Sequence, residues 1–254
     1  HDVMIIGGGS GGYAAAIRAA QLGANVVLAE CAETGGTCVN RGCIPSKVWL
    51  RAGDLLDRLK TGKEFGINAS LEEIDFKTLT ERKSGVSAEI RMGMEALLKN
   101  NGVEVVKGRA VIKSPQEVDV EDRVIETKKI IVATGSAICA WEIPGLKEIA
   151  MTTDDVLEMT AVPESILVCG SGHIEVEMAF LLNAFGSKVV MAAGSARILP
   201  KEDSETSQRI AQVLREAGVE IIPRTSLGSV ETTRAGAICK LSGPKEQSVK
   251  VEKV

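Results

Sequence analysis

The sequence is poor in the residue types on which several kinds of function depend. Aromatic residues make up 3% of the 254 residues, and the 30 Lys and Arg do not outnumber the 34 Asp and Glu, so the net charge is −4. A nucleic-acid surface needs a basic excess and aromatic side chains that stack on bases, so we expect no nucleic-acid partner. With only two histidines, His1 and His173, a histidine-rich metal site is disfavoured as well.

Long apolar runs are also missing. No run approaches the ~20 residues that span a membrane, so we expect no membrane contact. The N-terminus carries no basic segment followed by an apolar stretch, as a secretory signal would. We therefore expect a cytoplasmic protein, or one of the mitochondrial matrix or a plastid in a eukaryote. A close cysteine pair in such a chain favours redox or metal chemistry over a structural disulfide.

The hydrophobic patterning predicts an α/β protein with tandem Rossmann-like dinucleotide-binding domains, of the type that binds FAD or NAD(P). Two strand–helix–strand units of the same design begin near residues 2 and 165. We expect a first domain over 1–145 and a second, incomplete one over 146–254. The predicted elements are strands at 2–6, 25–29, 165–169, 188–192 and 219–222, helices at 11–23, 38–60, 70–100, 174–184 and 204–216, and short β runs within 103–132.

The first glycine motif follows the first predicted strand and opens a helix. It reads Gly7-x-Gly9-x-x-Gly12, in which the glycines allow a tight turn, a close approach of pyrophosphate and close packing of helix on strand. Glu30 ends the next strand, where an acidic side chain can bind a ribose hydroxyl. The pattern predicts a dinucleotide site on the helix N-terminus.

The segment 35–47 contains two cysteines near the start of a predicted helix. The helix dipole can stabilise a thiolate there, so Cys38 and Cys43 form a candidate reactive pair. Lys47 lies one helical turn beyond Cys43 and can place a cation beside it. A structural disulfide and a metal site remain as alternatives.

This segment resembles the redox-active disulfide motif of the pyridine nucleotide–disulfide oxidoreductases. Its ending, Cys-Ile-Pro-Ser-Lys, is most similar to that of the dihydrolipoamide dehydrogenases, whereas glutathione reductases usually have Lys where Ser46 stands. Mercuric reductases share Pro-Ser-Lys and remain an alternative. The resemblance also covers Thr134-Gly135-Ser136 and the segment 197–200, and therefore extends over essentially the whole chain.

The resemblance implies FAD and NAD as cofactors and assigns roles to particular residues. Cys38 would exchange with the dithiol substrate, Cys43 would form a charge-transfer pair with the flavin, and Lys47 would stabilise the reduced flavin. The implied FAD-binding residues are Gly7, Gly9, Gly12, Glu30, Gly36, Thr37, Lys47, Thr134 and Gly135. The implied NAD-binding residues are Gly170, Gly172 and Glu177, the last near the nicotinamide.

The implied activity is the oxidation of protein-bound dihydrolipoamide, with electrons passing through Cys38–Cys43 and FAD to NAD. The implied partners are a lipoyl domain of a 2-oxo acid dehydrogenase complex or the glycine-cleavage carrier protein, and a second copy of the full-length chain in a homodimer.

The second glycine motif departs from the family pattern. Glu175 replaces its third glycine, and Ala193 stands where an acid would bind ribose at the end of the next strand. We expect weakened or altered NAD binding. Adequate binding through backbone contacts, and no binding, remain alternatives.

The chain is also shorter than the members of this family. They continue into a C-terminal dimerisation domain, which supplies a His–Glu pair to the partner's substrate site. We therefore expect this chain to be a fragment or a truncated product without full turnover. A truncated, non-catalytic flavin-binding module is the alternative from a different functional class.

Overall fold

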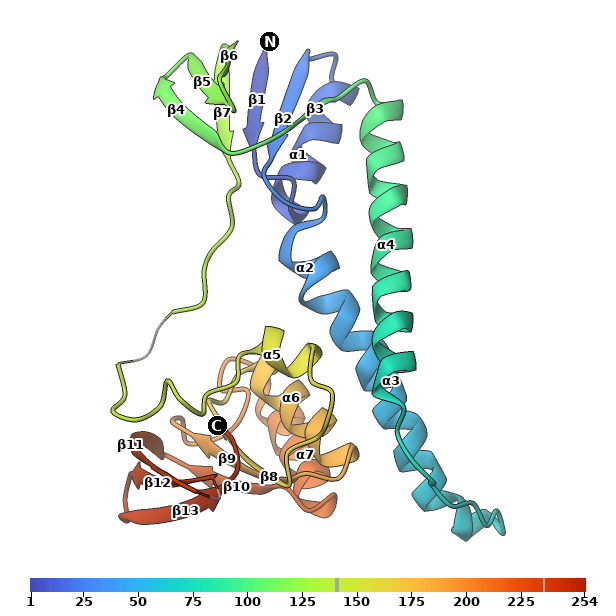
Figure 1. Ribbon diagram of the computed structural model, residues 1–254, viewed down its shortest axis with the longest axis vertical. Helices are drawn as coiled ribbons and strands as arrows, with labels where there is room; N and C mark the ends of the chain where they lie inside the picture. The colour runs from blue at the N-terminus through green and yellow to red at the C-terminus, as the bar shows by residue number, and fades with distance from the viewer. Residues whose placement is uncertain (140–141, 235) are drawn as a thin grey trace. The chain divides into compact units, whose positions relative to one another are not determined.

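A computed structural model describes residues 1–139, 142–234 and 236–254. The chain divides into two compact units (Figure 1). Unit 1 contains His1–Lys47 and Thr80–Ile138, and unit 2 contains Val48–Leu79 and Cys139–Val254. Among the described helices, none combines the length and the apolar character that crossing a bilayer requires. The α/β class and the Rossmann-type parallel sheets expected from the sequence are confirmed in both units.

Unit 1 is built on a four-stranded parallel sheet with the order β3-β2-β1-β7. Its central strands β1 and β2 are nearly continuous apolar runs because both of their faces are covered. On one face Ile5 and Leu28 pack with Ala16 of α1, and on the other Met4 and Val27 pack against a small antiparallel sheet. The elements are β1 (Val3–Ile6), α1 (Ser10–Gln21), β2 (Val26–Glu30), β3 (Glu104–Lys107) and β7 (Lys129–Val132).

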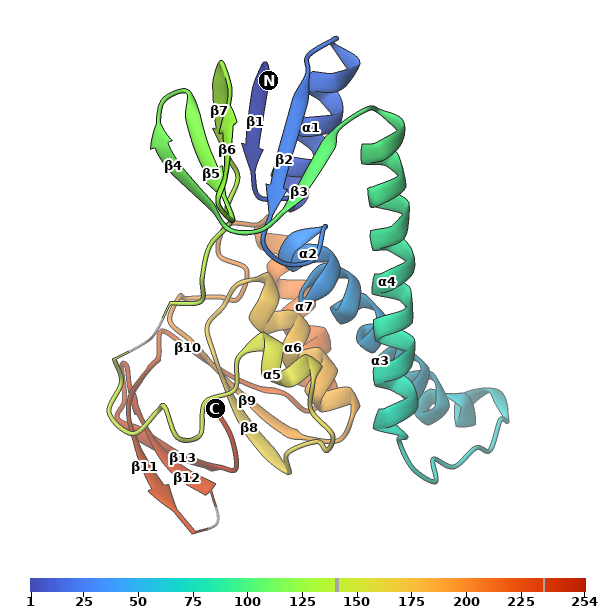
Figure 2. The same cartoon turned by 45° about the horizontal axis from the view of Figure 1, so that its top comes forward.

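The antiparallel sheet lies between β3 and β7 in the chain (Figure 2). It is the meander expected within 103–132, with strands β4 (Ala110–Ser114), β5 (Glu117–Val120) and β6 (Arg123–Glu126). The sequence reasoning missed β6. Its turn is formed by Glu121 and Asp122, both with positive φ (48° and 67°), which matches the tight turns that join two strands of a hairpin.

The long helix predicted over 38–60 is wrong at its start. Two helices occupy the region, α2 (Gly36–Asn40) and α3 (Cys43–Thr61). Pro45 explains the break, because a proline has no N–H and is tolerated only in the first turn of a helix, so the helix has to restart just before it. The backbone at the break also favours a glycine at residue 42, because a Cβ there would lie 3.0 Å from the Thr37 carbonyl oxygen.

The helix predicted over 70–100 begins later than expected. It is α4 (Phe76–Asn100), and it follows the short 3₁₀ helix η1 (Gly62–Phe65) and a segment without helix. Asp75 fixes the start, because its carboxylate accepts hydrogen bonds from the backbone N–H of Thr78 (3.1 Å) and from its hydroxyl (2.7 Å).

Unit 2 contains a second parallel sheet with the order β10-β9-β8. Helix α6 packs on β8 and β9, as α1 does on β1 and β2 in unit 1. The core centres on fully buried Trp49, whose ring centroid lies 5.8 Å from those of Phe76 and Phe185. The elements are α5 (Thr153–Leu157), β8 (Ser165–Cys169), α6 (His173–Ala184), β9 (Lys188–Ala193), α7 (Ser204–Glu216) and β10 (Glu220–Pro223).

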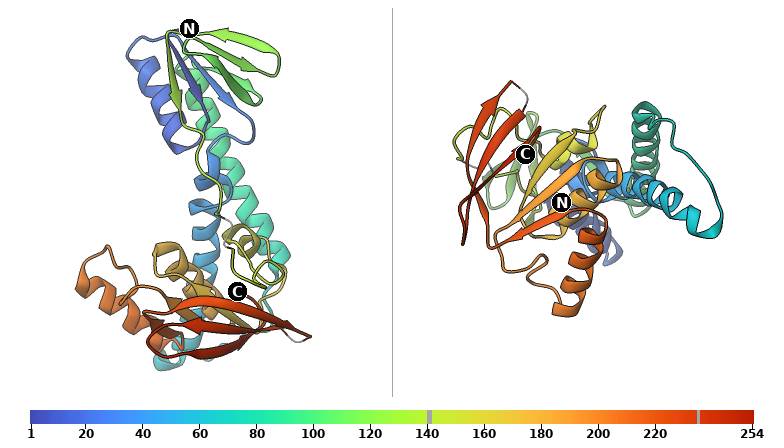
Figure 3. Two further views of the ribbon diagram at one scale, coloured as in Figure 1. Left: turned by 90° about the vertical axis from the view of Figure 1, so that its left-hand side faces the viewer. Right: turned by 90° about the horizontal axis from the view of Figure 1, so that it is seen from below.

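An antiparallel layer that the sequence reasoning missed follows β10 (Figure 3). It consists of β11 (Ser226–Thr233), β12 (Gly236–Ser242) and β13 (Gln247–Val251). After it the chain returns to the parallel sheet, because Lys253 forms a single parallel bridge with Ile166 of β8.

Candidate functional site

The first glycine motif forms a turn in which Gly7 and Gly12 are sterically required. A Cβ on Gly12 would lie 1.8 Å from the Gly7 carbonyl oxygen, and a Cβ on Gly7, whose φ is +103°, would lie 2.3 Å from the Ala133 carbonyl oxygen. Helix α1 starts just beyond, with no side-chain cap and no acidic residue in its first turn. The turn therefore presents an N-terminal helix end to which an anion can bind.

Glu30 lies at the carboxyl end of β2, beside this turn. Its carboxylate accepts hydrogen bonds from the backbone N–H of Gly8 (2.6 Å) and of Ala32 (2.7 Å), and the residue is 8% exposed. These two bonds fix the carboxylate at the edge of the glycine turn, where the Rossmann pattern places a ribose.

The cysteine segment meets the glycine turn through close backbone contact. Gly9 pairs with Gly35, and a Cβ on Gly36 would lie 2.7 Å from the Gly9 Cα. Thr134 approaches from the carboxyl end of β7, since its Cα lies 3.2 Å from the position of a Cβ on Gly7. Gly135 follows it with a φ of +76°. The structure thus gathers most of the predicted flavin-binding residues around one turn of unit 1.

The two candidate redox cysteines lie on different helices that meet at the break described above. Cys38 is in α2 and is partly buried, whereas Cys43 is the first residue of α3 and is exposed. Both are reduced thiols in the structure. Thr37 precedes Cys38 in α2, and Lys47 lies one turn beyond Cys43 on α3, both with exposed side chains. The spacing expected between Cys43 and Lys47 is therefore confirmed.

The two thiols interact directly. A hydrogen bond with Cys43 raises the pKa of Cys38 above its ordinary value, burial raises it further, and a hydrogen bond with the Ser10 hydroxyl partly offsets this. The lowered pKa that a helix N-terminus suggested is therefore not found for Cys38. A thiol that keeps its proton can donate a hydrogen bond to a neighbouring sulfur, so the Cys38 thiol is suited to act as such a donor toward Cys43.

Side-chain interactions of Asn40, Arg91 and Glu33, together called the Asn40 clasp, hold the cysteine segment in place. The sequence reasoning missed them. The Asn40 side-chain amide donates to the carbonyl oxygens of Gly36 (3.0 Å) and Thr34 (3.1 Å), and its oxygen accepts from the Arg91 guanidinium (2.9 Å). Arg91, on α4, also lies 3.3 Å from a carboxylate oxygen of Glu33. The clasp therefore fixes both ends of the loop that leads into Cys38.

We expect Asn40→Ala to loosen this loop. Four hydrogen bonds are lost around a half-buried side chain, including one to the Glu33 carbonyl oxygen at 3.3 Å. Their loss corresponds to a local cost of about 1–3 kcal/mol, and amide hydrogen exchange over 33–42 should speed up accordingly. The matched control is Asn101→Ala, because the Asn101 amide makes one surface bond to the Leu97 carbonyl (2.8 Å). Equal exchange in the two variants would show that the clasp does not hold the segment.

The second glycine motif lies in unit 2 at the carboxyl end of β8. Gly170 has a φ of +138°, Gly172 precedes α6, and Glu177 is half-buried on that helix. Unlike α1, helix α6 has a carboxylate at its N-terminal end, because Glu175 accepts a hydrogen bond from the Gly172 backbone N–H at 2.8 Å. These residues therefore do not fit a dinucleotide pyrophosphate as they stand.

Two further observations concern other kinds of site. Within residues 1–139, 142–234 and 236–254, no three His, Cys, Asp or Glu side chains gather closely enough to hold a metal ion.

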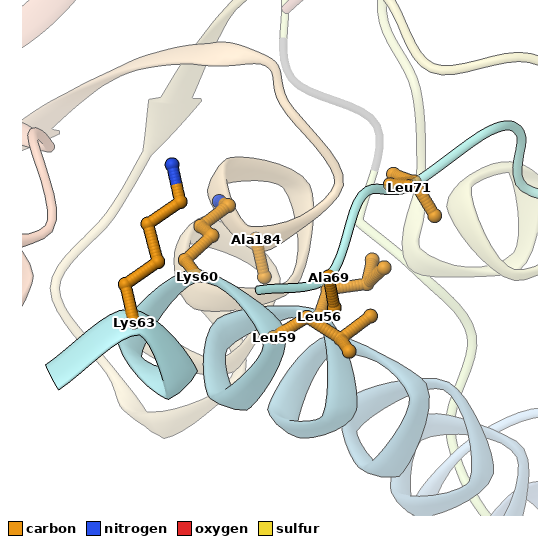
Figure 4. A pocket seen from close by; sticks show the side chains of 7 residues that line it. All are labelled: Leu56, Leu59, Lys60, Lys63, Ala69, Leu71 and Ala184. Carbon is orange, nitrogen blue, oxygen red and sulfur yellow. The ribbon is translucent and has the colours of Figure 1, made fainter. Parts of the chain in front are cut away.

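Figure 4 shows a pocket of unit 2 that none of the predicted site residues lines. Its lining is mostly apolar, with two lysines: Leu56, Leu59, Lys60, Lys63, Ala69, Leu71 and Ala184.

The geometry of unit 1 fits a flavin dinucleotide. The glycine turn is free of side chains where a pyrophosphate would approach, and Glu30 marks a ribose position. In the loop between β2 and α2, the fully buried Thr34 hydroxyl has no hydrogen-bond partner among the described residues. A cysteine pair adjoining such a turn defines a class, the flavoproteins that exchange electrons with disulfides.

Comparison with known proteins agrees with this class. The family model described as "Pyridine nucleotide-disulphide oxidoreductase" matches residues 1–254, and the chain belongs to this family. It is 39% identical to a dihydrolipoyl dehydrogenase of Acholeplasma laidlawii, over 91% of this chain and 70% of that protein. It is 35% identical to a dihydrolipoyl dehydrogenase of Bacillus subtilis, over 99% of this chain and 56% of that protein.

Two other relatives are reductases with different names. A mercuric reductase of Bacillus cereus is 34% identical, over 91% of this chain and 37% of that protein. Among solved structures, the HOCl-induced flavoprotein disulfide reductase RclA of Escherichia coli matches with a TM-score of 0.81 at 26% identity, covering 100% of this chain and 55% of that one. The chain thus spans from about a third to 70% of the length of these relatives.

Proposed function

We propose that this chain carries the flavin and disulfide centre of a dihydrolipoyl dehydrogenase-type enzyme, which oxidises protein-bound dihydrolipoamide to lipoamide. The observation that carries the proposal is the Cys38–Cys43 thiol pair, which adjoins the glycine turn through Ser10 and through the contact of Gly36 with Gly9. The identity to two dihydrolipoyl dehydrogenases over most of the chain supports this substrate class.

The chemistry starts from the oxidised pair. A thiolate of dihydrolipoamide attacks the sulfur of Cys38, which forms a mixed disulfide and releases Cys43 as a thiolate. The second substrate thiol then attacks the substrate sulfur of the mixed disulfide, which closes the lipoamide ring and releases Cys38. Two electrons and two protons have then left the substrate. Both electrons reside on the reduced cysteine pair, and the protons pass to Cys38 and to solvent or a base.

The residues around the pair have distinct roles in this scheme. The hydrogen bond between Cys38 and Cys43 favours the released thiolate on Cys43, because the Cys38 proton stays in place. Lys47, one turn further along α3, adds a cation on the side of Cys43. FAD, held by the glycine turn and Glu30, supplies a two-electron acceptor for the reduced pair when it is bound.

The partners follow from this substrate. A lipoyl domain of a 2-oxo acid dehydrogenase complex, or the glycine-cleavage carrier protein, would present the dithiol, and the full-length protein would act as a homodimer. Such partners would place the protein in the cytoplasm, or in the matrix or plastid of a eukaryotic cell. NAD is the acceptor that membership of this family suggests, but the second glycine motif does not fit it.

A mercuric reductase-type activity is the second candidate, favoured by the 34% identity to that enzyme. The test uses the full-length protein with a dye as the final electron acceptor, so that the result does not depend on NAD. We expect kcat/KM for dihydrolipoamide to exceed that for glutathione by at least about tenfold, which is ~1.4 kcal/mol of transition-state discrimination. With a reduced dye as the electron donor, Hg²⁺ reduction that exceeds dihydrolipoamide oxidation would favour the second candidate.

A further inference from the structure

The two glycine turns of this chain can be compared residue for residue. In the first turn the Gly7 backbone N–H donates to the Ala29 carbonyl at 2.8 Å, and in the second the Gly170 N–H donates to the Ala192 carbonyl at 3.0 Å. The spacing from the first glycine to the end of the second strand is the same in both. Each residue of the second turn therefore has a direct counterpart in the first.

The turns differ most at the end of the helix where a phosphate would bind. Helix α1 begins without a side-chain cap and without an acid in its first turn. Helix α6 begins under the Glu175 carboxylate, which is bonded to the Gly172 N–H at 2.8 Å. A Cβ on Gly170 would meet the Cγ of Glu175 at 2.6 Å and its Cδ at 2.7 Å. The carboxylate therefore lies over both glycines of the motif.

The ribose position differs as well. Glu30 in the first unit bridges two backbone N–H groups, but its counterpart Ala193 is fully buried and has no polar side-chain atom. Around Ala193, the residues that correspond to the two donors are serines, and the Ser171 hydroxyl donates to the Ser195 hydroxyl at 3.3 Å. In unit 2 the hydrogen bond between Ser171 and Ser195 thus stands where the Glu30 carboxylate binds two N–H groups in unit 1.

We propose that Glu175 is an intramolecular anion that occupies the phosphate-binding end of α6, so that unit 2 excludes the pyrophosphate of a pyridine dinucleotide. Glu175 is thereby a specificity-determining residue of this domain. The inference rests on family membership and on the geometry of unit 2, and it does not depend on the dithiol chemistry proposed for unit 1.

The physical reason is competition between two anions for one set of donors. A bound pyrophosphate would need the Gly172 N–H and the positive end of the α6 dipole, both of which Glu175 already uses. It would also lie beside a like charge in a partly buried position, where repulsion is less screened than in water. Removing the carboxylate removes both costs, so the affinity for a dinucleotide should rise at least about tenfold.

The test is NAD⁺ binding by calorimetry with the purified chain and five variants. Glu175→Gly restores the glycine of the motif, and Glu175→Ala removes the carboxylate without adding a helix glycine. The matched control is Glu205→Gln, which removes one acid from the first turn of α7. Ser171→Gly with Ala193→Glu rebuilds the ribose contact of the first turn, and Glu175→Ala is also tested in that background. Thermal unfolding of every variant checks that it folds.

We expect the wild-type chain and Glu205→Gln to bind NAD⁺ alike and weakly. Both Glu175 variants should bind at least about tenfold more tightly, and the gain from Glu175→Ala should recur when the ribose contact is rebuilt. Equal affinity with and without the Glu175 carboxylate in both backgrounds, including no binding by either, would overturn the proposal. The experiment measures NAD⁺ binding and not dithiol oxidation. A result that overturns the proposal for Glu175 would therefore not bear on the function proposed for unit 1.

Discussion

Gly12→Ala is expected to abolish flavin binding and to destabilise the sheet of unit 1. The new Cβ would lie 1.8 Å from the Gly7 carbonyl oxygen, which is backbone and cannot move without opening the turn. Such overpacking costs about 3 kcal/mol or more at a rigid site. We expect faster amide exchange over residues 1–30 and no flavin absorbance in the purified protein.

Gly11 provides a matched control in the same helix. A Cβ on Gly11 meets nothing within 4 Å. Gly11→Ala should therefore bind FAD normally and gain up to about 1 kcal/mol from the higher helix propensity of alanine. If Gly12→Ala bound FAD as well as Gly11→Ala does, the close packing of α1 on its turn would not be what shapes the flavin site.

Replacing either Cys38 or Cys43 with serine is expected to reduce dithiol oxidation on the order of 10³-fold or more, because a disulfide needs both sulfurs. The double variant should lose no more than each single variant, since residues that act as a unit are not additive. With FAD bound, Cys43→Ser should lack a long-wavelength thiolate–flavin absorption band, whereas Cys38→Ser should retain one.

Cys31→Ser is the control for this series. Cys31 is an exposed cysteine in the loop after β2, and it is not part of the thiol pair. Its replacement should leave both the absorption band and dithiol oxidation near the wild-type level. A band that survives in Cys43→Ser, or a Cys38→Ser variant with full activity, would reverse or remove the roles assigned to the two thiols.

The sequence was most informative where local chemistry determines the structure. Gly7 and Gly12 have to be glycine, so their spacing located both the turn and α1 correctly. Strands 165–169 and helix 204–216 were predicted with the bounds that β8 and α7 have. The break between α2 and α3 could also have been predicted, because Pro45 rules out a helix that continues through residue 42.

Other features depend on contacts that no local pattern reveals. In β11 a register shift between Leu227 and Ser229 interrupts the alternation of buried and exposed residues, which makes that strand hard to recognise, although β12 alternates clearly. The clasp of Asn40 joins a loop to Arg91 on α4, far along the chain. The change from glycine to Glu175 indicated altered NAD binding, but only the structure revealed the bond to Gly172.

The central claim is that unit 1 holds FAD beside a Cys38–Cys43 pair that accepts electrons from a dithiol. The most direct measurement is the visible spectrum of the purified chain with FAD, before and after one equivalent of anaerobic dihydrolipoamide. We expect bound flavin and, on reduction, a new long-wavelength band from the Cys43 thiolate. Flavin that stays bound and shows no such band, or a chain that binds no FAD, would contradict it.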